Sequence, residues 1–379
     1  MMKMPARILL ILLCAVLITA LPFVVSSPNM LYEVKMELMN EEEGEEEEID
    51  FTEEEEEEET GLLERFFLST ARAEEDAAEE YDVVEEEIIE GDLSILPEWK
   101  LPLDFTPAPA PKKENYTEDS YEDDTIMVKM EHRDFDEETK IHIAWIRIAD
   151  ASQLRTGVYK PNKLGSSNAL PVTTISRKYN PVIAINGDNF TNDVPKKTYI
   201  YRMGQTVRAK GNKLKDILII DDQGDFHLYI KSQGLETGKT KNNKVVWMKP
   251  EEWEKANGRK MSNAFTFGPA LVKDGEIVET DTEYSYNPGG REPRSAIGQV
   301  GPLSYVIVIV EVNNRDGRSG MSHGKLAELM HELGCQQAYN LDGGNSAEMV
   351  FGEQVYKGMP GGSERGITDI IYFATAMPE

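Results

Sequence analysis

Residues 304–312 read Ser-Tyr-Val-Ile-Val-Ile-Val-Glu-Val, with an unbroken apolar run from Tyr305 to Val310. Successive side chains of a strand point to opposite faces, so a run that is apolar on both faces is typical of a strand in the middle of a sheet. The preceding segment, 294–300, predicts a second core strand. These two strands indicate a sheet at the centre of the fold.

Further short strands, separated by turn residues, surround this pair on both sides in the sequence. Asp, Gly and Asn between two apolar runs favour hairpins. Three hairpins are predicted on this basis: 126–130 with 140–148, 216–220 with 225–230, and 270–272 with 276–279.

Helices are fewer. Residues 323–333 repeat apolar side chains at the spacing of one helical face, with Ser322 placed to cap the helix and Gly334 to end it. Segments 172–179 and 250–257 predict two more helices. Because strands outnumber helices without a regular alternation, we predict an α/β fold of the α+β kind, with a mixed, strand-rich central sheet in a single globular domain.

Charge divides the chain into parts. The 379 residues include 40 Lys+Arg and 69 Asp+Glu, but residues 33–124 alone hold 37 acidic and 6 basic residues, and residues 125–379 hold 32 of each. This predicts a folded domain at 125–379 behind a disordered, acidic, low-complexity stalk at 29–124, whose segment 97–111 reads as a Pro-rich linker. The acidic runs exclude nucleic-acid binding driven by net charge.

The N-terminal residues 1–28 predict an export signal or a membrane anchor. Lys3 and Arg7 precede a run of 18 uncharged residues, 8–25. We therefore expect an exported protein that is either anchored to the outer face of the membrane through this segment or secreted. The two cysteines, Cys14 and Cys335, exclude a disulfide framework and a cysteine-based zinc site in the folded part.

Four loops at predicted strand ends combine glycine with polar or charged side chains. Their candidate residues are Asn186, Gly187 and Asp188; Arg294 and Ser295; Asp342, Gly343, Gly344, Asn345 and Ser346; and Arg365, with Arg318 as a further cation. A simple turn or a surface arginine explains any one of them alone. Four such loops, with carboxylates and arginines together, predict a site for an anionic, phosphorylated ligand.

These loops resemble those of the phosphodiester glycosidase family, which includes the mannose-phosphate uncovering enzyme and exported bacterial relatives. The segments that carry the resemblance are 185–190, 267–275, 293–298, 317–319, 338–346 and 365–367. The chain departs from the usual pattern at Ser295, Asn345 and Gly366, and none of these changes removes a charged group. The resemblance covers about residues 180–375.

The resemblance implies hydrolysis of a sugar-1-phosphodiester on an extracellular or cell-wall glycan such as an exopolysaccharide. Such a reaction places a carboxylate near the anomeric carbon, for which Asp342 and Asp188 are the candidates. The arginines and the Gly343 and Gly344 amides would then face the leaving phosphate, with the other loop residues as substrate contacts. No cofactor is expected, although a divalent cation such as Ca²⁺, held by Asn186, Asp188 and Asp342, is left open.

Two other classes of function stay open at this point. An exported module could bind a phosphorylated cell-surface polysaccharide without cleaving it, and loss of activity with retained binding in an Asp→Asn variant would separate the two. A scaffold role that uses the acidic stalk as an interaction arm is the third alternative.

Overall fold

The computed structural model describes residues 93–161, 169–188, 199–211, 215–231, 235–239, 245–279, 284, 287–312 and 319–378. The predicted anchor and the acidic runs of the stalk lie outside the described residues, as does Arg318. None of the helices in the described ranges is long and apolar enough to cross a membrane.

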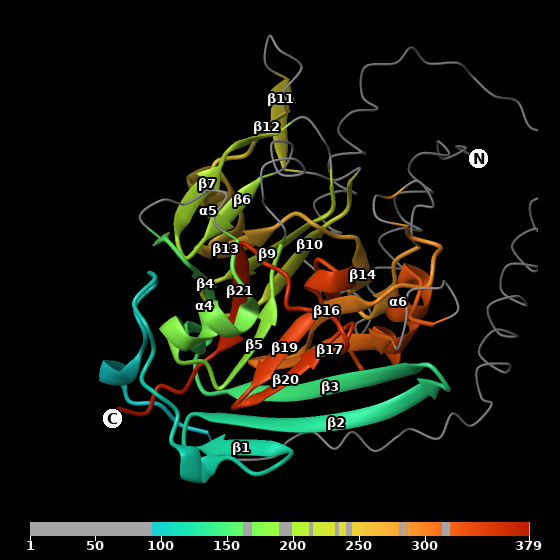
Figure 1. The fold of residues 1–379 in the computed structure, drawn as a ribbon. Helices are drawn as coiled ribbons and strands as arrows, with labels where there is room; N and C mark the ends of the chain where they lie inside the picture. The colour runs from blue at the N-terminus through green and yellow to red at the C-terminus, as the bar shows by residue number, and fades with distance from the viewer. Residues whose placement is uncertain are drawn as a thin grey trace, which may run out of the picture. The chain divides into compact units, whose positions relative to one another are not determined.

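The largest sheet has eight strands in the order β1-β2-β3-β17-β16-β18-β14-β15 (Figure 1). Their bounds are β1 Ser120–Asp123, β2 Ile126–Asp136, β3 Thr139–Ile148, β14 Ala270–Lys273, β15 Glu276–Ile277, β16 Arg294–Gly301, β17 Ser304–Val312 and β18 Gln337–Asn340. The run that predicted a central strand is β17, which pairs with β3 on one side and β16 on the other. That prediction is confirmed.

Three smaller sheets complete the strands. One has the order β20-β19-β5-β21-β4, one β10-β9-β13-β6-β7, and one β11-β12-β8. Their bounds are β4 Leu154–Val158, β5 Ile183–Asn186, β6 Ile200–Arg202, β7 Gln205–Arg208, β8 Lys210–Gly211, β9 Ile217–Asp221, β10 Phe226–Tyr229, β11 Glu236–Lys239, β12 Val245–Trp247, β13 Met261–Phe265, β19 Glu348–Phe351, β20 Gln354–Lys357 and β21 Asp369–Phe373. All three predicted hairpins are present, as β2–β3, β9–β10 and β14–β15.

The described α-helices are α4 Val172–Tyr179, α5 Pro250–Asn257 and α6 His323–Glu332, at the three predicted places. The Ser322 hydroxyl accepts a hydrogen bond from the Lys325 amide, which caps α6 as expected. Gly334 follows the helix with a φ of +74°, the left-handed conformation that favours glycine at a helix end.

The sheet arrangement differs from the prediction. Instead of one mixed central sheet, the described strands form four sheets, and every pairing between them is antiparallel. Local periodicity identifies a strand but not its partner, so it could not distinguish these arrangements. The α+β, strand-rich part of the prediction is confirmed, because the three helices lie on the outer faces of the sheets.

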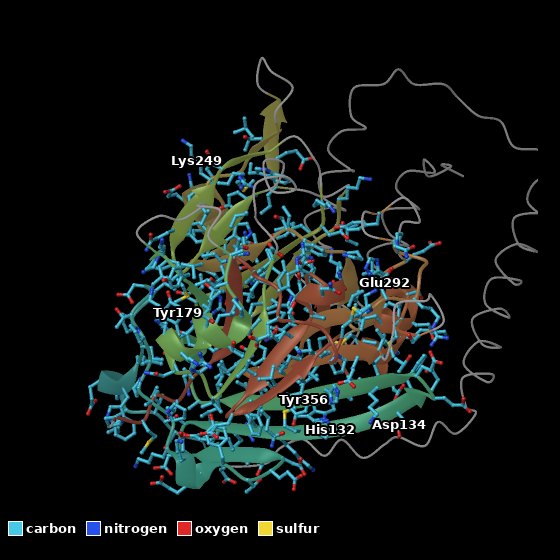
Figure 2. All side chains as sticks on the ribbon, viewed as in Figure 1. His132, Asp134, Tyr179, Lys249, Glu292 and Tyr356 are labelled. Atoms are coloured by element: carbon cyan, nitrogen blue, oxygen red, sulfur yellow. The ribbon has the colours of Figure 1, made fainter. Side chains whose placement is uncertain are left out.

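The main core lies between the eight-stranded sheet and the facing strands of the two five-stranded sheets. Ile307, Ile185 and Phe265, one from each of the three sheets, are fully buried in it. The opposite face of the large sheet packs against α6, and α4 covers the outer face of the β5–β21 sheet. Figure 2 shows one contact between sheets, where Tyr356 of β20 lies over His132 of β2 with ring centroids 5.2 Å apart.

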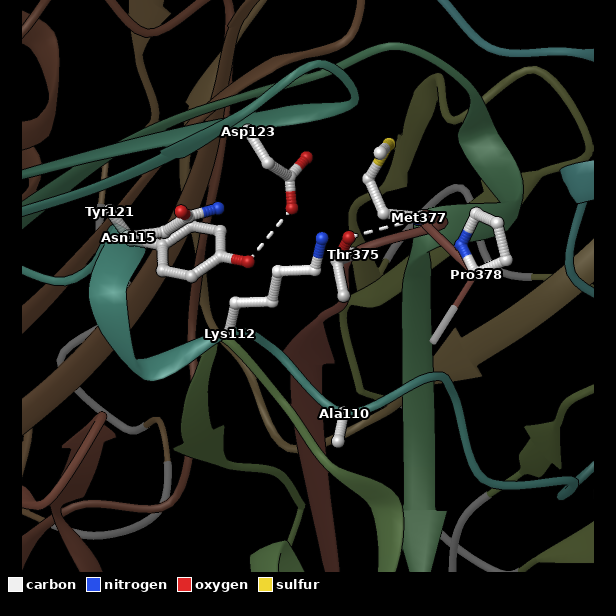
Figure 3. Close-up of a pocket in the computed structure, with 8 residues that line it drawn as sticks. All are labelled: Ala110, Lys112, Asn115, Tyr121, Asp123, Thr375, Met377 and Pro378. Carbon is white, nitrogen blue, oxygen red and sulfur yellow. Dashed lines mark hydrogen bonds between the residues drawn. The ribbon is translucent and has the colours of Figure 1, made fainter.

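Residues 93–124, which the sequence assigns to the stalk, pack against the domain in the structure. Phe105, Ala108 and Tyr121 are buried, and the Arg155 guanidinium donates to the backbone carbonyls of Pro102, Asp104 and Thr106. Figure 3 shows a small pocket lined from this segment and from the C-terminal end of the described chain by Ala110, Lys112, Asn115, Tyr121, Asp123, Thr375, Met377 and Pro378. Part of the predicted stalk therefore packs with the domain, because Phe105 and Ala108 of the Pro-rich stretch are buried in a cluster with α4 and the β5–β21 sheet.

Candidate functional site

Three of the predicted loops meet at the side chain of Asn186, the last residue of β5. Its Nδ2 donates to the Asp342 carbonyl at 2.6 Å, and its Oδ1 accepts from the Ser295 hydroxyl at 2.8 Å and from the Glu348 amide at 3.2 Å. The side chain is fully buried. Asn186 thus joins the ends of β5 and β18 to the starts of β16 and β19, so the structure brings three of the four predicted loops together.

Gly187 lies in a place that no side chain fits. A Cβ there would lie 2.7 Å from the carboxyl group of Asp369. The Gly187 amide donates to the Asp369 carbonyl at 3.0 Å, and its carbonyl accepts from the Asp342 amide at 3.4 Å. The glycine lets the β5 loop pass between the two aspartates.

Asp188 is buried and held from several sides. One carboxylate oxygen accepts from Arg202 Nη2 at 3.1 Å and from the Thr266 amide at 2.8 Å, and the other accepts from the Phe267 amide at 3.2 Å. Such a carboxylate is an anchor inside the fold rather than a group presented to a ligand.

Asp342 follows β18, and its backbone is fixed on both sides. Its carbonyl accepts from Asn186 and, at 3.2 Å, from the Ser295 hydroxyl. The residue is buried, with 7% of its surface exposed.

The hypothesis of a cation held by Asn186, Asp188 and Asp342 gains no support from this geometry. The Asn186 amide group is used within the fold, and the Asp188 oxygens accept from a guanidinium and two backbone amides. Within the described ranges, no group of three His, Cys, Asp or Glu side chains is arranged to hold a metal ion.

The two glycines after Asp342 form the loop, and both lie close to the backbone of Pro293. The Gly344 amide, predicted as an anion donor, donates instead to the Pro293 carbonyl at 2.8 Å, and a Cβ on Gly343 would lie 2.7 Å from the same oxygen. Asn345 is exposed at the tip of the short 3-10 turn Gly344–Ser346, and Ser346 is buried. Asn345 is the residue of this loop that faces solvent.

Arg294 does not take the position predicted for a phosphate clamp. It is 3% exposed, and its guanidinium donates to the carbonyls of Met321, Asn287 and Gly290. It also contacts His323 Nε2 at 2.9 Å; burial and this cation lower the pKa of His323 to about 3, so the imidazole is neutral and accepts the bond. The physical reason is strand alternation: Ser295 faces Asn186, so its neighbour Arg294 points to the opposite face of β16, toward α6.

Arg365 is exposed in the loop before β21, while its neighbour Glu364 is tied to the domain. Glu364 accepts from the Thr173 hydroxyl at 3.0 Å, at the start of α4. Burial and the nearby Glu364 raise the pKa of Glu348 to about 8. This carboxyl pair holds the Arg365 loop against the start of β19, two residues beyond Ser346.

Two charged residues of this region were missed by sequence reasoning. Arg202, at the end of β6, is fully buried and bonds both Asp188 and Asp369, the latter at 2.7 Å. Asp369 opens β21 and is also fully buried. The one signal in the sequence was a charge directly beside an apolar strand, at Tyr199-Ile200-Tyr201-Arg202 and at Asp369-Ile370-Ile371, since charges are rarely buried without a partner.

The fold is strand-rich, and its glycine-containing loops lie together at Asn186. A family model described as phosphodiester glycosidase (NAGPA) matches residues 179–374. The chain belongs to this family, and the resemblance noted from its loops is confirmed.

Individual relatives are more distant. The SPbeta prophage-derived uncharacterized protein YomE of Bacillus subtilis (strain 168) is 34% identical over 113 residues, 29% of this chain but only 17% of that protein's length. Among solved structures, the zebrafish N-acetylglucosamine-1-phosphodiester alpha-N-acetylglucosaminidase (NAGPA) catalytic domain, auto-inhibited by its pro-peptide, gives a TM-score of 0.51 at 14% identity, covering 70% of this chain and 87% of that one. A hypothetical protein from Synechocystis gives a TM-score of 0.42 at 17% identity, covering 65% and 62% of the two chains. The zebrafish likeness concerns the fold.

Proposed function

We propose that this protein hydrolyses the glycosidic C–O bond of a sugar-1-phosphodiester, releasing a free sugar and leaving a phosphate monoester. The observation that carries the proposal is the convergence at Asn186 of three loops from the family pattern, with Asp342 fixed through its backbone beside them. Family membership supports a glycosidase of this kind. The substrate that suits an exported protein is an extracellular or cell-wall glycan, and export itself rests on the apolar N-terminal segment.

The proposed roles follow from charge. Positive charge develops on the sugar ring as the bond breaks, and the Asp342 carboxylate stabilises it or activates the attacking water. The departing phosphate needs positive groups and hydrogen-bond donors rather than a strong acid, because it is a good leaving group. With Arg294 turned toward α6, the exposed Arg365 takes the role of phosphate contact in this proposal, and Asn345 is the exposed polar residue of the glycine loop.

The test is incubation of the purified full chain with a panel of sugar-1-phosphodiesters in ¹⁸O-labelled water. We expect free sugar, with the label at its anomeric oxygen and none in the phosphate. Label in the phosphate would mean P–O cleavage and would contradict the proposed bond. Binding of the same compounds without any sugar release, measured by calorimetry, would instead support a carbohydrate-binding module.

A further inference from the structure

One guanidinium joins two carboxylates beneath the loop that carries Gly187. Arg202 Nε donates to Asp369 Oδ2 at 2.7 Å, and Nη2 donates to Asp188 Oδ2 at 3.1 Å. Its remaining donor, Nη1, bonds the carbonyls of Tyr201 and Ala264. The planar fork of arginine fits two carboxylates at once, which a lysine cannot do. The three charged side chains therefore form one rigid unit, called here the Arg202 triad.

The triad is short of positive charge. The charged groups that act on Asp369 are Arg202 of β6, Asp188 after β5 and Asp342 after β18, three carboxyls in all against one guanidinium. Asp369 Oδ1 has no hydrogen-bond partner among the described residues. A buried carboxyl in these surroundings retains its proton more readily, and burial together with the two neighbouring aspartates raises the pKa of Asp369 to about 7.

The triad also contacts the site directly. The Asp369 carboxyl fills the space where a Gly187 side chain would lie, and the Asp369 carbonyl accepts from the Gly187 amide. The Gly187 carbonyl in turn accepts from the Asp342 amide. A single residue, Gly187, therefore links the backbone of Asp369 to that of the residue proposed to act on the sugar.

We propose that Asp369 is a positioning residue for the reaction: through Arg202 and Gly187 it holds the Asp188–Asp342 region in place, and its own proton sets the negative charge beneath the bound phosphodiester. This inference rests on the proposed function. When Asp369 is protonated, the buried charge beneath the site is smaller by one unit, which favours an anionic substrate. When it ionises, repulsion between like charges weakens substrate binding.

We expect KM to depend on pH more strongly than kcat does. In the wild type, KM should rise several-fold as the pH passes from 6 to 8.5, because Asp369 ionises over that interval, while kcat changes less. Asp369→Asn stays neutral at every pH and keeps an oxygen for Arg202, so its KM should rise less than that of the wild type over the same range; Glu348, with a pKa of about 8, still ionises in both proteins. Asp221→Asn is the matched control, since Asp221 is another buried aspartate, bonded to His227 in the β9–β10 hairpin, and its variant should keep the wild-type KM profile.

A second measurement needs neither a variant nor a substrate. In protein labelled with ¹³C at the aspartate side-chain carboxyls, NMR titration should show an aspartate with a midpoint near pH 7. That resonance should be absent from Asp369→Asn if the variant folds. If every aspartate of the wild type titrates below about pH 5, in the ordinary range for this side chain, the inference is overturned.

The two measurements separate failure of this inference from failure of the proposed function. An active wild type and Asp369→Asn with the same pH dependence of KM would overturn the role of Asp369 alone. If the wild type releases no sugar from any compound, the proposed function fails and Asp369 has no reaction to position, even where its carboxyl titrates near neutrality. A drop in kcat as large as that of Asp342→Asn would also contradict a positioning role.

Discussion

The side chain of Asn186 donates a 2.6 Å hydrogen bond to the backbone carbonyl of Asp342, across 156 positions of sequence. The same side chain accepts from Ser295 and from the Glu348 amide, so one amide group serves four segments of chain. An amide is suited to this task because it carries donors and acceptors together. The position of the candidate catalytic residue thus depends on the side chain of a residue far away in the sequence.

Asn186→Asp should destabilise the domain strongly. The new carboxylate oxygen would face the Asp342 carbonyl where a donor is needed, and a buried charge without a donor costs about 3 kcal/mol or more. Thermal unfolding monitored by circular dichroism is the measurement. Asn345→Asp, at an exposed position of the neighbouring loop, should change the melting temperature little; equal losses in both variants would argue against the Asn186 network.

Asp342→Asn should lose activity, whereas Asp188→Asn should lose stability. For Asp342→Asn we expect sugar release to fall by about 10²–10⁴-fold with a near-normal melting temperature, because a carboxylate's charge is lost at the reacting bond. Asp188→Asn removes a carboxylate from the fully buried Arg202 and should lower the stability by about 3–5 kcal/mol. Unfolding and turnover measured on both variants provide the comparison. Turnover by Asp342→Asn within a few-fold of wild type would show that Asp342 only forms a turn.

Substitution of Arg294 should affect the stability of the domain, whereas substitution of Arg365 should affect substrate binding. Arg294→Lys cannot reproduce the bonds to three carbonyls and His323, so it should lower stability by about 2–3 kcal/mol while the folded fraction keeps its KM. Arg365→Lys should leave the melting temperature unchanged and raise KM, since a point charge replaces a two-pronged donor. A normal melting temperature for Arg294→Lys together with a raised KM would return Arg294 to the role of a phosphate clamp.

Limited proteolysis of the full chain should yield a stable fragment that begins between residues 93 and 105. Phe105 and Ala108 are buried, and Arg155 binds the carbonyls of residues 102, 104 and 106. Mass spectrometry gives the fragment's first residue. Arg155→Met should move that residue toward 125, because the carbonyls then lose their donor, whereas a wild-type fragment that already starts near 125 would mean that the segment is not held.

Ionisation of the Glu348 carboxyl should lower the stability of the domain as the pH rises. Its pKa is raised from the usual range to about 8, so the folded state binds this proton more tightly than the unfolded state. The contribution is present below the unfolded pKa of about 4.3 and is lost as the pH rises toward 8, at no more than about 1.4 kcal/mol per pH unit. Glu348→Gln should reduce the difference in melting temperature between pH 5 and pH 8.5, and the part due to Asp369, whose pKa is raised to about 7, should remain. An unchanged pH dependence in this variant would assign the effect to other groups.

Local patterns predicted the elements of this fold well and their assembly poorly. The helix at 172–179 and the β9–β10 hairpin follow from short-range spacing and turn residues, which the sequence states directly. The division into four antiparallel sheets depends on pairings such as β5 with β19, between residues more than 160 positions apart. No local period encodes such a pairing.

The candidate site was also predicted only in part: its loop residues were identified, but not how all of their side chains are arranged. Glycine and polar residues at strand ends identified Asn186, Ser295 and Asp342, which the structure brings together. The direction of the Arg294 side chain could not be predicted, because alternation along a strand sends adjacent residues to opposite faces and the face cannot be chosen before the sheet is known. Arg202 and Asp369 were missed because each is a single charge beside an apolar strand, and its burial becomes evident only when its partner is in place.

Arg294 and Ser295 are adjacent on β16, so their side chains point to opposite faces. The number of residues between them and the rest of the strand decides which face each one takes. Deleting or inserting one residue between Ser295 and the paired stretch that follows it would turn the arginine inward to Asn186 and the serine outward to α6. Both networks would be lost in one step, although every residue type would remain present. Loop tips such as Asn345 can change length or identity without this penalty, so engineered variation in substrate choice belongs at the tips, and the length of β16 is best left untouched.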